Sequence, residues 1–436
     1  MSAMLKSVDW ASLDAADRER LFAPLPAQAG AEAAAVEIVE AIQRGGDAAL
    51  RDYARRFDGC SAEAFRVPRE ALTEARATLT SGDEDAIRAA TDAIRRFHEL
   101  QGLKSYAVET WPGVTASRRV LPIGCAGLYV PAGSAPLVST LLMLAIPAQI
   151  AGVPEIAVCV PPGRDGQVNA AILAAADLLG LENIFAVGGA QAIAAMAFGL
   201  GGVPKVDRIF GPGNAYVAAA KTHVAQMAGG PAIDLPAGPS EVMVMADGEA
   251  DPDFVAADLL AQAEHDALAR VTLVSATEDV RRAALSALEP RLAGLPREAI
   301  ARDAMAASVC VLAPGEHWAD VVNTAAPEHL ILHMAVANEF AEQVRNAGAI
   351  FVGPWSPESM GDYAAGPNHT LPTGRAARSW SGVTVESFQK TITMVEASRD
   401  GADAIAPTVE ALAALEGLDG HRQAMKVRRQ AGEGRS

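Results

Sequence analysis

Several histidines of this sequence stand beside carboxylates or amides, at spacings that suit metal binding or proton transfer. Gln262 and His265 lie three residues apart near the end of a predicted helix that begins after Asp251-Pro252, so their side chains share one face. An i, i+3 pair that includes a histidine commonly offers two ligands to one metal ion. The alternative for this pair is a capping or surface histidine.

Adjacent Glu328 and His329 follow Pro327, where a predicted helix ends and a predicted strand begins. An imidazole with a pKa near neutral pH, beside a carboxylate, suits removal of a proton from an alcohol and then activation of water. Both residues are therefore catalytic candidates, with a solvent-exposed pair of loop residues as the alternative.

A long polar loop spans residues 355–373 and carries Asp362 and His369. Loops of this length inside compact domains are usually functional, and Asp362 is a candidate metal ligand. For His369 we expect a structural hydrogen bond.

Glu416 and His421 lie near the C-terminus and flank two glycines, Gly417 and Gly420. The glycines end one predicted helix and allow another to begin, which leaves the two polar residues at a corner between helices. Taken alone, this segment is typical of an ordinary turn.

Three glycine-rich segments complete the candidates: Gly127–Pro136, Val187–Gln191 and Gly211–Asn214. Each follows an extended segment, and exposed backbone amides or a helix N-terminus at such a place can hold a pyrophosphate. Each segment alone is equally compatible with a simple turn.

The elements that must position these residues alternate from Leu121 onward between short β-branched runs and Ala-rich helical stretches. The predicted strands are residues 156–160, 184–187, 208–210, 241–245, 271–274, 308–312, 330–332 and 349–352. This alternation predicts βαβ units and mostly parallel sheets. We expect an α/β fold with two doubly wound, incomplete Rossmann-like domains, although neither has the G-x-G-x-x-G motif.

The same pattern suggests domain boundaries. We expect an N-terminal arm over residues 1–25 and a first α/β domain, with the candidate metal and catalytic residues, over 26–128 and 241–380. A second α/β domain over 129–240 would hold the glycine-rich loops, and residues 381–436 would form a helical C-terminal tail.

The charge balance excludes some classes of partner. The 436 residues include 36 Lys and Arg against 53 Asp and Glu, which gives a formal net charge of −17. We therefore expect no nucleic-acid or anionic-membrane partner. The longest apolar stretch, Leu137–Ala151, is too short for a membrane span and predicts a core helix.

The N-terminus and the cysteines favour a cytoplasmic protein. Residues 1–20 contain no apolar segment of the kind found in signal peptides. The four cysteines (Cys60, Cys125, Cys159 and Cys310) show no CxxC spacing, so we expect reduced, structural thiols.

Taken in order, these segments resemble the histidinol dehydrogenase family from about residue 25 to residue 430. The most specific stretches are Val187–Gln191, Phe210–Asn214, Asp234–Glu241, Gln262–His265, Pro327–His329 and Gly361–Ala364. The resemblance implies zinc held by Gln262, His265, Asp362 and His421, a mixed N/O set that suits this metal. It also implies that His421 crosses to the partner subunit, so that a homodimer shares its active sites.

The resemblance further implies the activity and the remaining roles. L-histidinol would be oxidised to L-histidine through a bound aldehyde by two NAD, with Glu328 and His329 as catalytic residues. Ser240, Glu416, His329 and the metal ligands would surround the substrate, and Tyr129, Gln191 and Asn214 would contact NAD. Because many aldehyde oxidations use a cysteine thiohemiacetal, Cys125 is a further candidate, ranked below Glu328 because no base is evident beside it.

Two departures from the family pattern keep alternatives open. Residues 374–382 and Asp419-Gly420 differ from common family residues at the border of the substrate region. They favour the alternative of a related dehydrogenase that oxidises another polar alcohol, such as a sulfonated diol. From another class, a zinc hydrolase could use Glu328 to activate water without NAD. Glu416, a natural partner for a substrate ammonium, favours histidinol.

Overall fold

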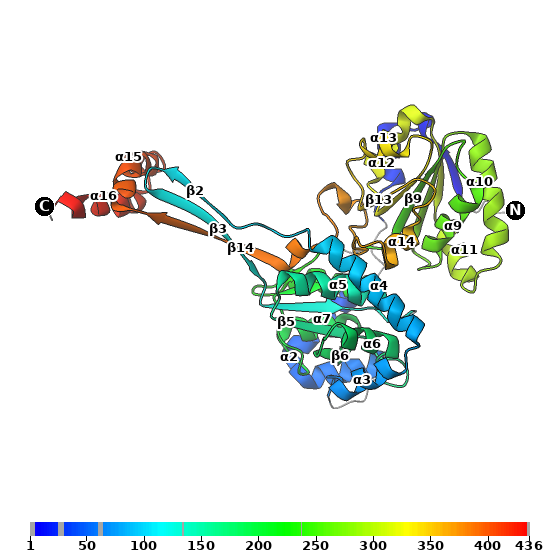
Figure 1. Ribbon diagram of the computed structural model, residues 1–436, viewed down its shortest axis with the longest axis horizontal. Coiled ribbons are helices and arrows are strands. Elements are labelled where there is room, and N and C mark those ends of the chain that lie inside the picture. The colour runs from blue at the N-terminus through cyan, green and yellow to red at the C-terminus, as the bar shows by residue number, and fades with distance from the viewer. Residues whose placement is uncertain (1–4, 25–29, 60–63, 133–134, 237, 434–436) are drawn as a thin grey trace.

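The protein consists of two α/β lobes and a long arm that carries the C-terminus (Figure 1). The computed structural model describes residues 5–24, 30–59, 64–132, 135–236 and 238–433. Gly133 and Ser134 of the first glycine-rich segment, and Cys60, lie outside the described residues.

The first lobe is built on a five-stranded parallel sheet with the order β6-β5-β4-β7-β8. Its strands are β4 (Cys125–Tyr129), β5 (Glu155–Val160), β6 (Ile184–Ala186), β7 (Arg208–Phe210) and β8 (Ala232–Ile233). Alternate residues of β5 face two separate cores, since Val158 and Val160 pack in one and Ala157 and Cys159 in the other. Both faces of the sheet are therefore covered, as expected for parallel strands.

The second lobe repeats this arrangement in a six-stranded parallel sheet, β1-β11-β10-β9-β12-β13. Its strands are β1 (Lys6–Asp9), β9 (Glu241–Ala246), β10 (Arg270–Ser275), β11 (Val309–Leu312), β12 (His329–His333) and β13 (Ala349–Val352). From β9 to β13 the strand order matches that from β4 to β8, and β1 is added beside β11. In both sheets the order of the strands therefore reverses beside the first strand of the repeat. This switch point lies between β4 and β7 in one sheet and between β9 and β12 in the other.

Helices cover the five-stranded sheet. They are α2 (Ala31–Phe57), α3 (Arg69–Ala77), α4 (Ser81–His98), α5 (Val138–Ala151), α6 (Ala170–Leu178), α7 (Gly189–Phe198) and α8 (Ala215–Gln226). Most of α5 is buried, which confirms the predicted core helix. A capping box between Thr80 and Asp83 begins α4.

The other sheet carries α1 (Ala15–Leu21), α9 (Pro252–Ala263), α10 (Glu278–Leu292), α11 (Glu298–Ala306), α12 (Trp318–Ala325), α13 (Ala337–Ala341) and α14 (Glu358–Tyr363). Asp251 caps α9 by accepting a hydrogen bond from Asp253 N, and Pro252 occupies the first turn. Short 3-10 helices are η1 (Trp10–Ser12), η2 (Gly315–His317), η3 (Ala376–Arg378) and η4 (Val385–Phe388).

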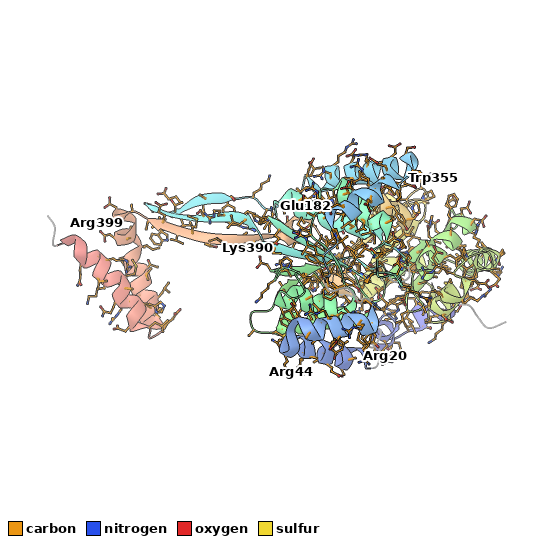
Figure 2. The ribbon with its side chains drawn as sticks, turned by 90° about the horizontal axis from the view of Figure 1, so that it is seen from below. Arg20, Arg44, Glu182, Trp355, Lys390 and Arg399 are labelled. Atoms are coloured by element: carbon orange, nitrogen blue, oxygen red, sulfur yellow. The ribbon has the colours of Figure 1, made fainter. Side chains whose placement is uncertain are left out.

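The arm is a three-stranded antiparallel sheet that ends in two helices. Its elements are β2 (Tyr106–Trp111), β3 (Val114–Pro122), β14 (Gln389–Ala397), α15 (Arg399–Leu415) and α16 (Asp419–Glu433). In Figure 2, Lys390 lies along the arm and Arg399 near its far end. The expected tail is thus helical only after β14, because this strand pairs with β3, a partner more than 260 residues earlier.

Two expected boundaries need correction. Residues 26–128 do not join the six-stranded sheet, because α2 packs on α7 and α8, α3 on α6, and α4 on α5. The expected arm over residues 1–25 contributes β1, which pairs with β11 as an edge strand. The local sequence of an amphipathic helix does not show which sheet it packs against, and that of a short edge strand does not show which strand it pairs with. The sequence pattern alone therefore did not assign them.

Within the described residues, no helix combines the length and apolarity needed to cross a membrane. Cys125, Cys159 and Cys310 are buried and unpaired, which confirms for these three the expectation of reduced, structural thiols.

Candidate active site

Glu328 and His329 lie together at the amino end of β12, where backbone atoms of Glu241 in the neighbouring parallel strand hold both. His329 begins β12 and Glu241 begins β9, its neighbour. Glu241 N donates to Glu328 Oε2 at 2.8 Å, and His329 Nδ1 lies 3.1 Å from the carbonyl oxygen of Glu241. A carbonyl only accepts, so Nδ1 carries the proton and Nε2 is left as a bare base.

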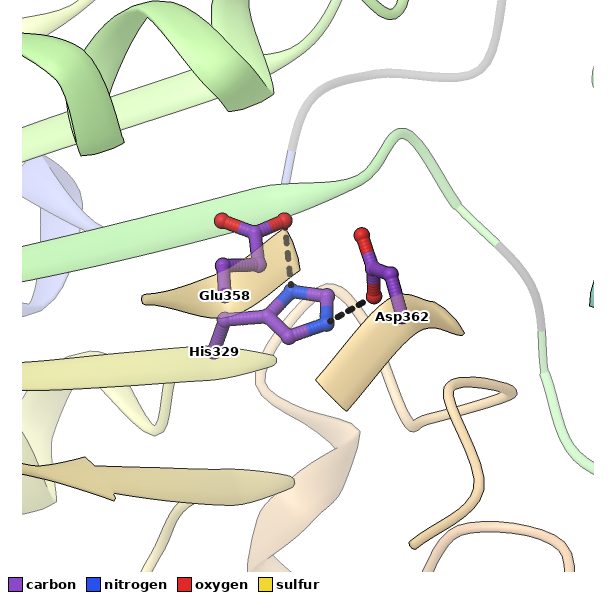
Figure 3. A group of neighbouring side chains, drawn as sticks. All are labelled: His329, Glu358 and Asp362. Carbon is purple, nitrogen blue, oxygen red and sulfur yellow. Dashed lines mark ion pairs between the residues drawn. The ribbon is translucent and has the colours of Figure 1, made fainter. Parts of the chain in front are cut away.

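Two carboxylates of α14 complete a buried cluster around this imidazole (Figure 3). His329 Nδ1 lies 3.6 Å from Glu358 Oε1, and His329 Nε2 lies 3.7 Å from Asp362 Oδ1. One ligand atom from each of the three lies within 4.8 Å of the others, as in a metal site. Glu358 was missed by the sequence analysis, although its i, i+4 spacing from Asp362 puts both on one face of a helix.

Burial shifts the pKa values of this cluster away from their usual range. Loss of water raises the pKa of Glu328 and of Glu358, and that of Asp362 to about 7. Burial, together with the nearby imidazoles of His369 and His265, lowers the pKa of His329 to about 3. Clustered carboxylates and a neutral imidazole are groups that a divalent cation would bind and neutralise.

Gln262 lies in the last turn of α9, and the exposed His265 follows two residues after the end of this helix. The His265 imidazole is near enough to His329 to lower its pKa. Gln262 is 1 % exposed, and neither its Oε1 nor its Nε2 has a hydrogen-bond partner in the part of the chain that the structure describes. Burial lowers the pKa of His265, so this imidazole is neutral and able to bind a metal. A buried amide without hydrogen-bond partners costs free energy of folding. The Gln262 oxygen and the His265 imidazole therefore fit a zinc ion, which both could bind as ligands.

His369 joins the two lobes behind this cluster. Its Nδ1 lies 2.9 Å from the carbonyl oxygen of Asp362, and its Nε2 lies 3.2 Å from Thr140 Oγ1 at the start of α5. Both ring nitrogens are occupied, which confirms the structural hydrogen bond expected for His369. The residue fixes the end of α14 against the five-stranded lobe.

The remaining residues predicted to bind the substrate lie in two different parts of the chain. Ser240 directly precedes β9, and its carbonyl oxygen accepts from Arg270 N at 2.9 Å, so it lies at the same sheet edge as Glu328. Glu416 and His421 are exposed and belong to the two helices at the far end of the arm (Figure 1). Within one chain, the structure does not bring them to the cluster.

The three residues predicted to contact NAD lie at the carboxyl edge of the five-stranded sheet. Tyr129 ends β4, Gln191 lies in the first turn of α7 after β6, and Asn214 caps α8 after β7 by accepting from Tyr216 N and Val217 N. Tyr129 Oη accepts a hydrogen bond from Gly189 N at 3.2 Å. Helix N-termini and a sheet reversal meet here, the usual place for a dinucleotide.

A buried ion pair fixes the loop between β7 and α8. Lys221 Nζ donates to Asp234 Oδ1 at 2.6 Å and to the carbonyl oxygen of Gly211 at 2.8 Å, while Gly211 N donates to Asp234 Oδ2 at 2.7 Å. Gly211 has a φ of +115°, and a Cβ there would lie 2.1 Å from the carbonyl oxygen of Tyr129. The loop therefore lies directly against the end of β4, which fits a cradle for a pyrophosphate.

Comparisons with known proteins agree with this geometry. The family model for histidinol dehydrogenase matches residues 26–429. The chain belongs to the histidinol dehydrogenase family. It is 47 % identical to the histidinol dehydrogenase of Xanthomonas euvesicatoria pv. vesicatoria over 97 % of this chain and 99 % of that one. It is 44 % identical to the one from Escherichia coli K12 over 97 % of each.

A solved structure agrees with the fold. The crystal structure of histidinol dehydrogenase from Elizabethkingia anophelis has a TM-score of 0.93 and 40 % identity to this chain, and 99 % of each chain is covered. The two incomplete Rossmann-like domains and the helical C-terminal end expected from the sequence are thereby confirmed.

Cys125, the other candidate for aldehyde chemistry, is unsuited to it. The thiol is buried in β4 of the five-stranded sheet. Burial and the nearby carboxylates of Glu155 and Asp207 raise its pKa to about 12. Because the thiolate is the nucleophile, a thiol that stays protonated at neutral pH is inert. Within this histidinol dehydrogenase fold, Glu328 remains the stronger candidate.

Proposed function

We propose that the protein is an L-histidinol dehydrogenase that oxidises L-histidinol to L-histidine with two NAD. The observation that carries the proposal is the buried group of His329, Glu358 and Asp362 in a chain of this family. The buried amide of Gln262, which has no hydrogen-bond partner among the described residues, adds support. Zinc bound to Gln262, His265, Asp362 and His421 of the partner subunit would hold the imidazole and amine of the substrate and fix its hydroxymethyl carbon. NAD bound at the carboxyl edge of the five-stranded sheet would accept one hydride in each oxidation.

The residues of the chain supply the proton transfers. His329 donates through Nδ1 to the carbonyl oxygen of Glu241, so its Nε2 removes the proton of the substrate hydroxyl in the first oxidation. Glu328 is held by Glu241 N and, together with His329, takes a proton from the water that adds to the bound aldehyde. The hydrate then loses its second hydride and leaves as the carboxylate.

The stoichiometry of the reaction tests this function directly. Purified protein with zinc, L-histidinol and NAD⁺ is expected to release two NADH for each histidine, measured by absorbance and amino-acid analysis. One NADH for each substrate, or turnover only of another alcohol in a panel that includes a sulfonated diol, would contradict the proposal. Hydrolysis of an ester or amide without dinucleotide would contradict it as well.

We also propose that the active form is a homodimer in which the arm of one protomer completes the site of the other. Large apolar side chains of the arm are exposed: Tyr106, Val108, Trp111, Ile392, Met394, Val395, Leu412, Leu415, Leu418 and Val427. A thin sheet with apolar residues exposed on this scale cannot form a core of its own, so it needs a partner surface. Glu416 ends α15 and His421 lies in α16, the helices at the end of this arm (Figure 1), where they would reach a second chain.

Mixing two inactive variants tests the shared site. His421→Ala lacks the residue supplied by the arm, and His265→Ala lacks one supplied by the lobe. After mixing and subunit exchange, half of the sites in a mixed dimer have both residues, so about a quarter of the wild-type activity is expected to return. If activity stays absent although mass spectrometry shows mixed dimers, His421 acts within its own chain or not at all.

A further inference from the structure

Asp58 brings a carboxylate to the edge of the five-stranded sheet where Tyr129 and Gln191 lie, although it comes from a different element. It follows the last residue of α2. Its Oδ2 accepts hydrogen bonds from Gly188 N at 3.1 Å and from Gln191 Nε2 at 3.0 Å. Burial raises the pKa of Tyr129, and the nearby Asp58 carboxylate raises it further. Asp58 therefore contacts or adjoins two of the three residues proposed to bind NAD.

The position of this carboxylate matches a known position in dinucleotide-binding folds. A Cβ added to Gly188, which follows β6, would lie 2.7 Å from Pro161 Cβ and 3.0 Å from Asp58 Oδ1. Because Pro161 directly follows β5, Asp58 Oδ1 lies beside the carboxyl ends of β5 and β6. In Rossmann folds an Asp or Glu that follows the glycine-rich turn by about 20 residues binds the ribose 2′-hydroxyl of NAD. Here β5 is followed by Pro161-Pro162-Gly163, none of which is acidic.

The electrostatic state of Asp58 agrees with a ligand-binding role. Its hydrogen-bond donors are two neutral groups, both on Oδ2. Within the described part of the chain, no cation pairs with it and no donor reaches Oδ1. Burial raises its pKa. A partly buried carboxylate with one free oxygen, in the rim of a proposed cofactor site, is a candidate for recognition of hydroxyl donors.

We propose that Asp58 selects NAD over NADP by accepting a hydrogen bond from the 2′-hydroxyl of the adenosine ribose. The inference rests on the proposed function and deepens it by assigning the residue that sets the choice of cofactor. The 2′-phosphate of NADP would bring further negative charge against a carboxylate that has no neutralising cation, so NADP is rejected by repulsion.

The test is a cycle of two proteins and three dinucleotides. Wild type and Asp58→Asn are titrated by calorimetry with NAD⁺, NADP⁺ and an NAD⁺ analogue that lacks the adenosine 2′-hydroxyl. Wild type is expected to bind the analogue about tenfold more weakly than NAD⁺, since a hydrogen bond to a charged group is lost. Asp58→Asn is expected to bind NAD⁺ about tenfold more weakly, to bind the analogue as it binds NAD⁺, and to bind NADP⁺ no more weakly than wild type does.

Controls separate recognition from support of the loop. Asp52→Asn changes an exposed carboxylate of the same helix and is expected to leave all three affinities unchanged. If Asp58 only supports the loop, Asp58→Asn would weaken the binding of NAD⁺ and of NADP⁺ by the same factor, and this result would overturn the inference. So would a wild type that binds the analogue as tightly as NAD⁺, a measurement that does not depend on whether Asp58→Asn folds.

The same titrations distinguish a failure of the proposed function. If wild type binds neither NAD⁺ nor NADP⁺ and forms no NADH from L-histidinol, the proposed function itself is wrong. If wild type binds and reduces NAD⁺ but binds NADP⁺ and the analogue equally tightly, only the role proposed for Asp58 is wrong.

Discussion

The two parallel sheets share the strand order from β4 to β8 and from β9 to β13, yet the residues proposed to be functional lie at opposite edges. In the five-stranded sheet, Tyr129 and Asn214 lie at the carboxyl ends of strands. In the six-stranded sheet, Glu241 and His329 lie at the amino ends. The same topology would therefore carry a site for an anionic cofactor in one sheet and a site for a cation in the other.

The helix termini explain why each edge suits its ligand. Helices that follow parallel strands begin at the carboxyl edge, where their N-terminal amides and partial positive charge favour a pyrophosphate. Helices end at the opposite edge, where their partial negative charge favours a cation. Gln262, near the C-terminal end of α9, lies at that edge together with Glu328 and Asp362. The proposed metal site and the proposed NAD site thus lie at opposite strand ends of their respective sheets.

Metal removal is the sharpest way to break this comparison. Dialysis against a chelator is expected to abolish NADH formation from L-histidinol, because the carboxylates of Glu358 and Asp362 lose the cation that would neutralise them. The affinity for NAD⁺ by calorimetry is expected to stay within about twofold of the loaded protein, since its proposed site lies on the other sheet. Loss of NAD⁺ binding on chelation would show that the two edges form a single site.

Removal of the proposed base tests the amino edge alone. His329→Asn is expected to lower kcat by about a thousandfold, because general base catalysis contributes factors of this size. Zinc content by atomic absorption and NAD⁺ affinity should remain as in wild type. His317→Asn, a change at η2 outside the cluster, serves as control and should keep full activity. A variant His329→Asn with near-normal kcat would remove this imidazole from the mechanism.

Loss of one partner of the buried ion pair tests the carboxyl edge. Lys221→Met leaves the carboxylate of Asp234, 1 % exposed in its side chain, without its ion-pair partner, so we expect the free energy of unfolding to fall by about 3–5 kcal/mol. Denaturant titration measures the change, and the exposed Lys205→Met should alter stability by less than about 0.5 kcal/mol. An equally small effect of Lys221→Met would mean that the loop of Gly211 is held by other contacts.

The smallest effect is expected at the carboxylate that the sequence did not reveal. Glu358→Gln keeps the shape of the side chain but removes its charge 3.6 Å from His329 Nδ1. Changes of this kind around a metal site cost about 10–100-fold in metal affinity or activity, so we expect kcat, zinc affinity or both to fall by about tenfold. If zinc affinity and the pH profile of kcat are both unchanged, Glu358 has only a packing role.

Several features of the fold could be read from the sequence. The strands β7 (Arg208–Phe210) and β13 (Ala349–Val352) have the predicted limits, because short β-branched runs between glycines and helices are local patterns. β1 and β14 were missed, because each is defined by pairing with a strand far away in the chain. Placement of α2, α3 and α4 on the five-stranded sheet was also not evident, since their apolar faces fit either sheet.

What the sequence determined by itself is the set of chemical groups and the elements that carry them. The spacing of Gln262 and His265 on one helix, the adjacent Glu328 and His329 and the glycine-rich turns all depend on neighbours in the chain. Only the tertiary structure decided that Glu241 holds both catalytic candidates through its backbone and that Glu358 joins Asp362 around His329. It also decided that Asp58 reaches the ends of β5 and β6 from a helix more than 100 residues earlier. Burial and contacts between distant segments set these charges and partners, and neither is a property of a short stretch of sequence.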